Sequence, residues 1–354
     1  MLEIRPGVEA DKSAVLALIR KVHGDEAADR AARRWDWQWF QDPRLKSPGF
    51  QGVVVTWEGQ ILASMSTIPA GLTVKGEASE GRWFTDALVD FGQMRQAIRW
   101  QRRNGTDLGL DLRNGLALAM LDDPASGPVQ MGKHLTTAMA AVCRKINFPM
   151  VGGTASWARI LTFRQPLGVY VGRGPAWLLG GLIDLFLPRL PHPKRSLVPL
   201  EGPFDERFDR LWENARLTHT AITRRDGAVL NWRYRAVPDT AIEVRLIEDD
   251  TGLLGYIIWS SFERHRQRRA SILDLLARDD AASILQDLLS GAMREMRAQG
   301  VHKLECYTGS DAVADVLARL GFARRPAEGD RQTVHLRGVH MDRLYVTRGD
   351  GDGG

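Results

Sequence analysis

The spacing of apolar and polar residues alternates between a helical and an extended period along the first half of the chain. Apolar side chains three and four residues apart predict helices over 11–24 and 25–40. Alternating side chains on both sides of Glu58-Gly59 predict a β-hairpin. The same rules predict further strands at 2–6, 71–91, 149–153 and 169–172, and helices at 131–146 and 156–165. Between 92 and 129 we expect a helix followed by either a strand or a buried helical turn.

The second half repeats this alternation after a proline-rich stretch at 188–203, which has no regular period and resembles a linker. A small set of helices and strands is expected beyond it. The helices are predicted at 204–216, 229–234, 279–300 and 311–322, and the strands at 241–249, 253–263, 270–277, 302–308, 333–336 and 343–347.

The order of elements indicates an internal repeat. Each half has a long helix, a strand, a turn, a shorter helix and a Leu-Gly pair, and the pairs Leu167-Gly168 and Leu320-Gly321 lie 153 residues apart. We therefore expect two domains of one architecture. The predicted limits are 1–187 and 204–347 for the domains, 188–203 for the linker and 348–354 for a flexible tail.

Composition narrows the class of protein. The chain has 354 residues, is 44% apolar, and carries 48 basic and 43 acidic side chains, a formal net charge of +5. This is enough apolar content for folded cores, and the mild basicity suits an anionic ligand as well as many ordinary proteins. The two cysteines lie in apolar patterns without metal-ligand spacing, so we expect buried free thiols in a reducing cytoplasm and no metal site. The N-terminus lacks the apolar core of a signal peptide.

The most apolar segment is AWLLGGLIDLFL, at 176–187. It contains Asp184, is followed by prolines, and is shorter than the roughly 20 apolar residues that cross a bilayer. A core or interdomain helix is the favoured interpretation, and an interfacial membrane helix is the alternative.

Several of these segments together resemble the GNAT family of acyltransferases (Gcn5-related N-acetyltransferases). GVVVTWEGQILAS (52–64) and RWFTDALVD (82–90) are similar to the family's hairpin and central strand, and LLGYIIW (253–259) and LARLGF (317–322) repeat the similarity in the second half. The resemblance covers roughly 1–175 and 200–347. It implies an α/β (α+β) fold with two GNAT-like domains, each a mixed, mostly antiparallel sheet flanked by helices.

The family holds the diphosphate of acyl-CoA with a Q/R-x-x-G-x-G/A loop at the start of a long helix. The segment GPVQMG, at 127–132, fits this loop only at its last glycine, and it can be a weakened cradle, a decayed one or an ordinary turn. A second placement at 94–99 has Arg95 but no glycine. In the second half, Asp279 and Asp280 would repel a diphosphate. The cofactor residues implied by the first placement are Gly127, Gln130, Met131, Gly132, Lys133 and His134.

Acyl transfer by the family needs a base for the amine and an acid for the leaving thiolate. Asp86 and Asp90 are candidate bases, with an exposed strand face or a turn cap as the alternative. Tyr307 is a candidate acid, with a structural role as the alternative. Trp232 and Tyr234 either form a substrate-contacting wall or pack between the domains.

The resemblance implies a cytoplasmic bacterial enzyme that moves an acyl group from acetyl-CoA or another acyl-CoA to an amine. The acceptor would be a small molecule, such as an amino sugar or a cell-envelope precursor. An aminoacyl-tRNA donor is a variant of this hypothesis. The alternative from another class is a non-catalytic module that binds a ligand or a partner protein. The sequence contains neither a P-loop nor the pattern of a nucleophilic triad.

Overall fold

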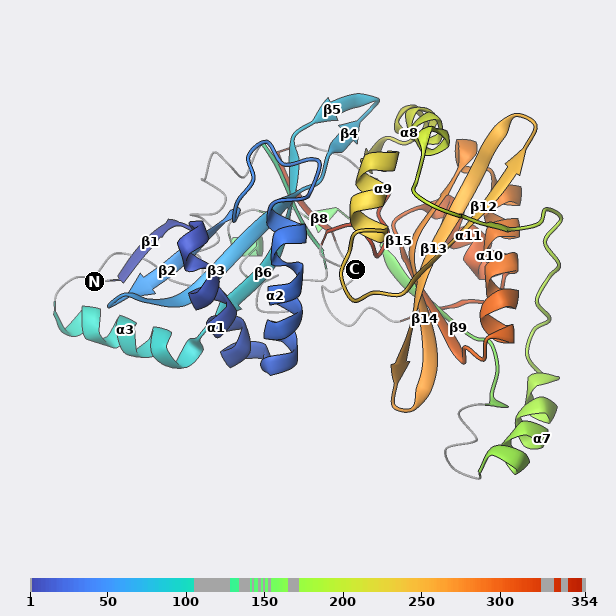
Figure 1. The fold of residues 1–354 in the computed structure, drawn as a ribbon, viewed down its shortest axis with the longest axis horizontal. Coiled ribbons are helices and arrows are strands. Elements are labelled where there is room, and N and C mark those ends of the chain that lie inside the picture. The colour runs from blue at the N-terminus through green and yellow to red at the C-terminus, as the bar shows by residue number, and fades with distance from the viewer. Residues whose placement is uncertain are drawn as a thin grey trace.

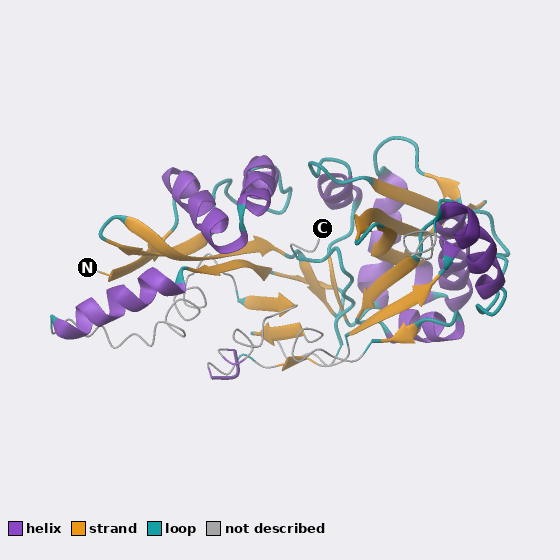
Figure 2. Ribbon diagram, turned by 90° about the horizontal axis from the view of Figure 1, so that it is seen from below, coloured by secondary structure: helices purple, strands orange, loops and turns teal. Residues whose placement is uncertain are grey.

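The chain folds into two units, each built around a seven-stranded mixed sheet, which lie beside one another in Figure 1. Helices cover both faces of the sheets, as the view in Figure 2 shows. The predicted mixed α/β class is thus confirmed. The computed structural model describes residues 2–104, 128–133, 141, 143–145, 148, 150–151, 154–164, 172–325, 334–338 and 343–351.

The first sheet has the order β1-β2-β3-β6-β7-β17-β8. Helices α1 and α2 pack on it through Val15, Leu18 and Trp39, as their periodicity predicts. The strands are β1 (Leu2–Pro6), β2 (Gly52–Trp57), β3 (Gln60–Pro69), β6 (Gly81–Val89), β7 (Val129–Lys133), β17 (Val334–Arg337) and β8 (Met150–Val151), and the helices are η1 (Glu9–Asp11), α1 (Lys12–His23), α2 (Asp25–Trp39) and α3 (Phe91–Arg103).

The second sheet has the order β10-β12-β13-β14-β15-β9-β16. Side-chain caps stand at the starts of three of its helices, where Asp205, Asp226 and Ser310 each accept a backbone N–H of the following turn. The strands are β10 (Val198–Pro199), β12 (Ile242–Asp249), β13 (Gly252–Arg264), β14 (Gln267–Ala277), β15 (Lys303–Thr308), β9 (Ala155–Ile160) and β16 (Ala323–Arg324). The helices are α7 (Arg173–Asp184), α8 (Glu206–Thr218), α9 (Gly227–Tyr234), η3 (Arg278–Asp280), α10 (Ala282–Ala298) and α11 (Asp311–Arg319).

The two units exchange one strand each. Strand β9, from the first half of the chain, pairs with β15 and β16 in the second sheet. Strand β17, from the second half, pairs with β7 and β8 in the first sheet. The two sheets therefore share one arrangement of strands. In each sheet the sixth strand, β17 in the first and β9 in the second, comes from the other half of the chain. The limits 1–187 and 204–347 consequently describe halves of the sequence, and each sheet contains a strand from outside its own half.

Two predicted helices are partly or wholly strands. Residues 156–165, expected to be helical, form β9 up to Ile160, and the first three residues of the helix expected at 131–146 belong to β7. A short apolar run does not distinguish a helix from a buried strand by its period. Pairing with distant strands decides both cases.

Further contacts connect the units. A three-stranded sheet joins β4 (Leu72–Val74) and β5 (Glu77–Ser79) to β11 (Ala221–Thr223). The rings of Trp37 on α2 and Trp232 on α9 stack with their centroids 4.7 Å apart. Each indole N–H donates to the other residue's backbone carbonyl, at 2.7 and 2.8 Å. This reciprocal pair satisfies both indole N–H groups, and it leaves the Trp232 ring buried and the Trp37 ring partly buried.

The Trp37–Trp232 pair gives a direct test of the contact between the units. We expect Trp232→Ala to lower the free energy of unfolding by about 3–5 kcal/mol, because Trp232 is 4% exposed and its ring leaves a large cavity. Trp100→Ala is the matched control, since Trp100 is 42% exposed and its loss should cost about 0.5 kcal/mol or less. Urea denaturation measures both variants. An equal loss of unfolding free energy in the two variants would show that the Trp37–Trp232 pair does not contribute to stability.

Candidate functional site

Each sheet contains one parallel strand pair that separates soon after it begins. Strands β6 and β7 pair only from Gly81 to Trp83 on the β6 side, although β6 continues to Val89. Strands β14 and β15 pair from Arg269 to Ile272 on the β14 side. We call these the first and second splayed pairs. In open α/β sheets, ligands bind beyond the carboxyl ends of such neighbouring parallel strands.

Asp86 lies on β6 within the first splayed pair, at a β-bulge. Thr85 opposes Ser66 and Leu88 opposes Ser64, so Asp86 and Ala87 together face one residue of β3. Asp86 has a left-handed φ of 47° and is exposed. Bulges and left-handed non-glycine residues concentrate at functional sites, although aspartate tolerates this conformation better than most residues. Asp86 thus lies on an exposed strand face, the alternative that the sequence left open for it, and its role as a base stays a prediction.

A cavity of about 20 Å³ lies between Asp86 and helices α1 and α2. That volume suffices for about one water molecule. It is too small for the acyl arm of a cofactor. Its polar wall is formed by Asp86, Ser64, Ser66 and Gln38, and its apolar wall by Val15, Ile19, Ala31, Trp35, Trp39 and Phe50.

Asp90 is the N-cap of α3, directly after β6. Its carboxylate accepts the backbone N–H groups of Gly92 and Gln93, at 3.1 and 3.2 Å, and pairs with the Lys21 ammonium at 2.5 Å. Burial alone would raise the pKa of Asp90, but the Lys21 ammonium and the two N–H groups outweigh burial and lower that pKa. Asp90 is therefore a turn cap held in its ionised form, the structural alternative of the two predicted for it.

The residues predicted to hold a diphosphate at 127–132 do not form a helix start. Gln130, Met131, Gly132 and Lys133 are buried on β7, and β17 pairs with all four of them. Lys133 donates to the carbonyls of Thr347 and Arg348, at 3.3 and 2.8 Å. Gly127 and His134 lie outside the described residues. The expected turn is thus a sheet strand, because pairing with β6 and β17 engages its backbone.

The C-terminal segment Leu344–Gly351 fills the second splayed pair. Thr347 forms a bridge to Thr308 of β15, and the Gly349 N–H donates to the Leu273 carbonyl of β14 at 2.7 Å. Gly349 has no room for a side chain, since a Cβ there would lie 2.0 Å from the Tyr234 hydroxyl oxygen. Residues 348–351 are therefore a packed part of the second unit, and the expected flexible tail is wrong for them.

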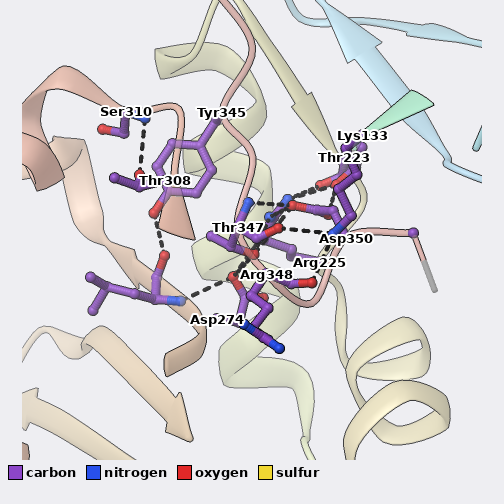
Figure 3. Close-up of polar contacts among 12 residues, drawn as sticks. Lys133, Thr223, Arg225, Asp274, Thr308, Ser310, Tyr345, Thr347, Arg348 and Asp350 are labelled. Carbon is purple, nitrogen blue, oxygen red and sulfur yellow. Dashed lines mark hydrogen bonds and ion pairs between the residues drawn. The ribbon is translucent and has the colours of Figure 1, made fainter. Parts of the chain in front are cut away.

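A buried cluster of charges holds this segment (Figure 3). Arg225 donates to Asp350 at 2.6 Å and to Asp274 of β14 at 3.1 Å. Thr347 donates its backbone N–H to Asp350 at 2.7 Å, and the Tyr256 hydroxyl donates to Asp274 at 3.1 Å. Arg225 and both carboxylates are almost fully buried, so each charge depends on these partners.

The two carboxylates respond differently to this environment. Burial alone would raise the pKa of Asp350, but Arg225 and two further cations outweigh it and lower that pKa to about 2. Burial raises the pKa of Asp274 more than Arg225 lowers it. The sequence offered one signal for this cluster, the lone acidic residue in the apolar strand ILDLLA. Nothing marked Asp350 or Arg225 as its partners.

The start of α10 is acidic, as predicted. Asp279 and Asp280 have left-handed φ values of 55° and 51° in the turn before α10. Burial raises the pKa of Asp280 to about 6. His219 faces Asp280 at 3.5 Å, and burial lowers the pKa of His219 to about 4, so the imidazole is neutral near pH 7. This turn offers carboxylates where a diphosphate would need donors.

The remaining predicted residues are buried between or within the units. Trp232 stacks on Trp37, so packing between the units accounts for it. Tyr234 and Tyr307 are 3% exposed, and burial raises the pKa of Tyr307 to about 12. Tyr307 lies on β15, in a different sheet from Asp86. Its role as an acid stays a prediction, as does the substrate contact of Tyr234.

The described residues do not fit acyl-CoA in the family manner. Asp90 occupies the N-terminus of α3, two aspartates precede α10, and the chain's own C-terminal segment lies in the second splayed pair. Among the described ranges, no three His, Cys, Asp or Glu side chains are grouped to hold a metal ion. The two cysteines are buried and free, as expected.

The ion pair of Asp350 is testable by substitution. We expect Asp350→Asn to lower the free energy of unfolding by about 3–5 kcal/mol, because it leaves the buried Arg225 short of a partner. Asp311→Asn is the control, since Asp311 is an exposed carboxylate that also pairs with an arginine. Chemical denaturation at neutral pH measures the difference. A loss no larger than that of the control would contradict the assigned role of Asp350.

The same variant has an expected pH dependence. The folded pKa of Asp350, about 2, lies below its ordinary value of 3.8, so ionised Asp350 stabilises the fold above about pH 4. That contribution is lost as the pH falls from about 4 to about 2, whereas the raised pKa of Asp274 acts in the opposite sense. The gap in stability between wild type and Asp350→Asn should therefore narrow over this window. A gap independent of pH would show that Asp350 is not ionised in the fold.

Comparison with known proteins gives matches by structure alone. No protein-family model and no curated protein sequence matches the chain. A GCN5-related N-acetyltransferase from Anabaena variabilis superposes with a TM-score of 0.60 and 14% identity, over 95% of this chain and 72% of that one. A probable N-acyltransferase from Enterococcus faecalis gives 0.60 and 10%, with the same coverage.

A third match is Saccharomyces cerevisiae N-myristoyltransferase, solved with bound myristoyl-CoA. It superposes with a TM-score of 0.54 and 11% identity, over 95% of this chain and 82% of that one. Such identities relate the proteins by fold. The matches extend over both units, and the exchanged strands complete both sheets. The chain therefore has the fold of the GNAT superfamily.

Proposed function

We propose that the protein is an acyltransferase that moves an acyl group to an amine, and that its first unit carries the reaction. The bulge at Asp86 is the observation that supports this most directly. It places an exposed carboxylate within the first splayed pair, beside a cavity of water size. The second splayed pair is filled by residues 344–351, so the first is the better candidate for catalysis.

Direct attack of the amine needs one base. The amine nitrogen forms a bond to the acyl carbonyl carbon, and the bond from that carbon to the leaving group breaks. Asp86 accepts the proton that the attacking nitrogen loses, directly or through a water beside Ser64 and Ser66. No covalent intermediate on the enzyme is required.

Acyl-CoA is the donor that we propose first, because the yeast match was solved with myristoyl-CoA bound. Asp90 occupies the place where the diphosphate would be expected, at the start of α3. A CoA diphosphate could lie there only if the Asp90 carboxylate moved away from Gly92 and Gln93. The Lys21 ammonium, which now pairs with Asp90, would then be available to pair with the phosphates.

The acceptor that we propose is a small molecule with a primary amine, such as an amino sugar or a cell-envelope precursor, in the cytoplasm of a bacterium. A donor of the aminoacyl-tRNA type is a variant. A second candidate function is a non-catalytic module that binds a ligand or a partner. The capped start of α3 and the C-terminal segment in the second splayed pair favour this alternative. A measurement of acyl-transfer turnover distinguishes the two functions, because a binding module gives none.

The base is tested by Asp86→Asn. We expect kcat/KM for acyl transfer to fall about 10²–10⁴-fold, with the acidic limb of the pH–rate profile lost, since Asn cannot accept the proton. Glu77→Gln, an exposed carboxylate on β5, is the control and should retain activity. If the activity of Asp86→Asn stayed within twofold of wild type, Asp86 would not be the base.

The donor is tested by titration calorimetry with acetyl-CoA and myristoyl-CoA. We expect Asp90→Asn to bind about two- to fivefold more tightly than wild type, because Asn keeps the helix cap and removes the charge that opposes phosphate. Asp205→Asn, the N-cap of α8, is the matched control and should not change the affinity. Folded protein that gives no heat with either CoA would exclude acyl-CoA and favour the binding module.

A further inference from the structure

Helix α7 and the turn after it carry the largest group of exposed apolar side chains among the described residues. Of the two residues after α7, Leu185 is 78% exposed and Phe186 89%. Figure 1 shows α7 projecting from the edge of the second unit. The core or interdomain helix favoured by the sequence is therefore wrong. The exposed group consists of Leu178, Leu179, Leu182, Ile183, Leu185 and Phe186.

The inward face of α7 is polar and tightly bound. Asp184 is buried, accepts the Thr162 hydroxyl and the Phe163 N–H at 2.7 Å each, and pairs with Arg297 at 3.6 Å. A Cβ at Gly180 would lie 2.5 Å from the Cα of Arg164, so the helix backbone contacts the chain before it. A helix on a water-soluble protein normally turns its apolar face inward. In α7 this arrangement is reversed, and its orientation is fixed.

The surroundings of α7 are basic. Between Ile160 and Arg195 the sequence has five basic residues and one acidic residue. The formal net charge of this segment is therefore +4, and that of the whole chain is +5. The one acidic residue, Asp184, is buried on the inward face. Arg164 lies against Gly181 and pairs with Asp184 at 3.7 Å, and Arg195 pairs with Asp287 at 2.8 Å. Arg189 follows Phe186 closely, with Lys194 farther along. Apolar side chains flanked by cations match the boundary between acyl chains and anionic headgroups.

We propose that α7 and the turn at 185–187 bind the surface of a bilayer that contains anionic lipids. The helix would lie along the interface with Leu178, Leu182 and Phe186 inserted and the neighbouring cations at the headgroups. A helix of 12 residues is about 18 Å long, against about 30 Å for the hydrocarbon core. No described helix could span a membrane. This proposal is independent of the acyl-transfer proposal, since α7 lies far from β6, the strand that carries Asp86, in Figure 1.

The test is flotation of the full chain with vesicles of phosphatidylcholine and phosphatidylglycerol, and with vesicles of phosphatidylcholine alone. We expect binding to the anionic vesicles that weakens in high salt. The double variant Leu182→Glu/Phe186→Glu should lower the partition coefficient about tenfold or more. Arg189→Glu should give a smaller loss. Leu217→Glu is the control, because Leu217 on α8 is 68% exposed and its change should leave binding intact.

Circular dichroism and urea denaturation confirm that each variant is folded before its binding is compared. Equal binding by the double variant and Leu217→Glu would overturn the proposal, as would absence of binding by the folded wild-type chain. A second copy of the chain could also cover the apolar side chains of α7. Light scattering without lipid tests this by measuring the oligomeric state. A wild-type dimer that the double variant converts to a monomer would also overturn the proposal, because α7 would then be a self-association surface.

Discussion

The buried ion pair between Arg225 and Asp350 holds the C-terminal segment in a position from which it contacts both units. Asp350 brings the last described residues of the chain into the second splayed pair, and the same segment accepts hydrogen bonds from Lys133 of the first sheet. Burying a charge pair costs free energy of desolvation. Removing only one partner costs more, because the other charge is then buried without compensation. The pair therefore fixes where the C-terminal segment lies more than it adds net stability.

This constraint separates the roles of two units that share one strand order. The second unit uses the space between β14 and β15 for its own chain, so it serves to hold the C-terminal segment and to complete the joint between the units. The first unit keeps a bulged central strand with an exposed carboxylate at Asp86. Its helix α3 begins with a capping aspartate, Asp90. The fold is thus shared with acyltransferases, and in this chain acidic side chains stand at the starts of α3 and α10.

The acidic start of α3 and the outward-facing apolar helix α7 have a common physical cause, which is a carboxylate that accepts nearby backbone N–H groups. An N-cap aspartate satisfies backbone donors that would otherwise bind an external anion. Asp184 acts similarly at the other end of the protein, because it satisfies the chain beside α7 and thereby turns the leucines outward. In both places a single buried or capping carboxylate decides which group remains available to a ligand or a surface.

The sequence by itself determined most of the local structure, because helical and strand periods are properties of neighbouring residues. The hairpins, the amphipathic helices and the mixed α/β class follow from it. Only the tertiary structure decided that 155–160 and 129–133 are strands, since their partners are distant in the chain. It also decided that Asp350 meets Arg225 and that α7 faces outward. These outcomes depend on which segments pair across the exchanged sheets, and that pairing leaves no periodic signal in either segment alone.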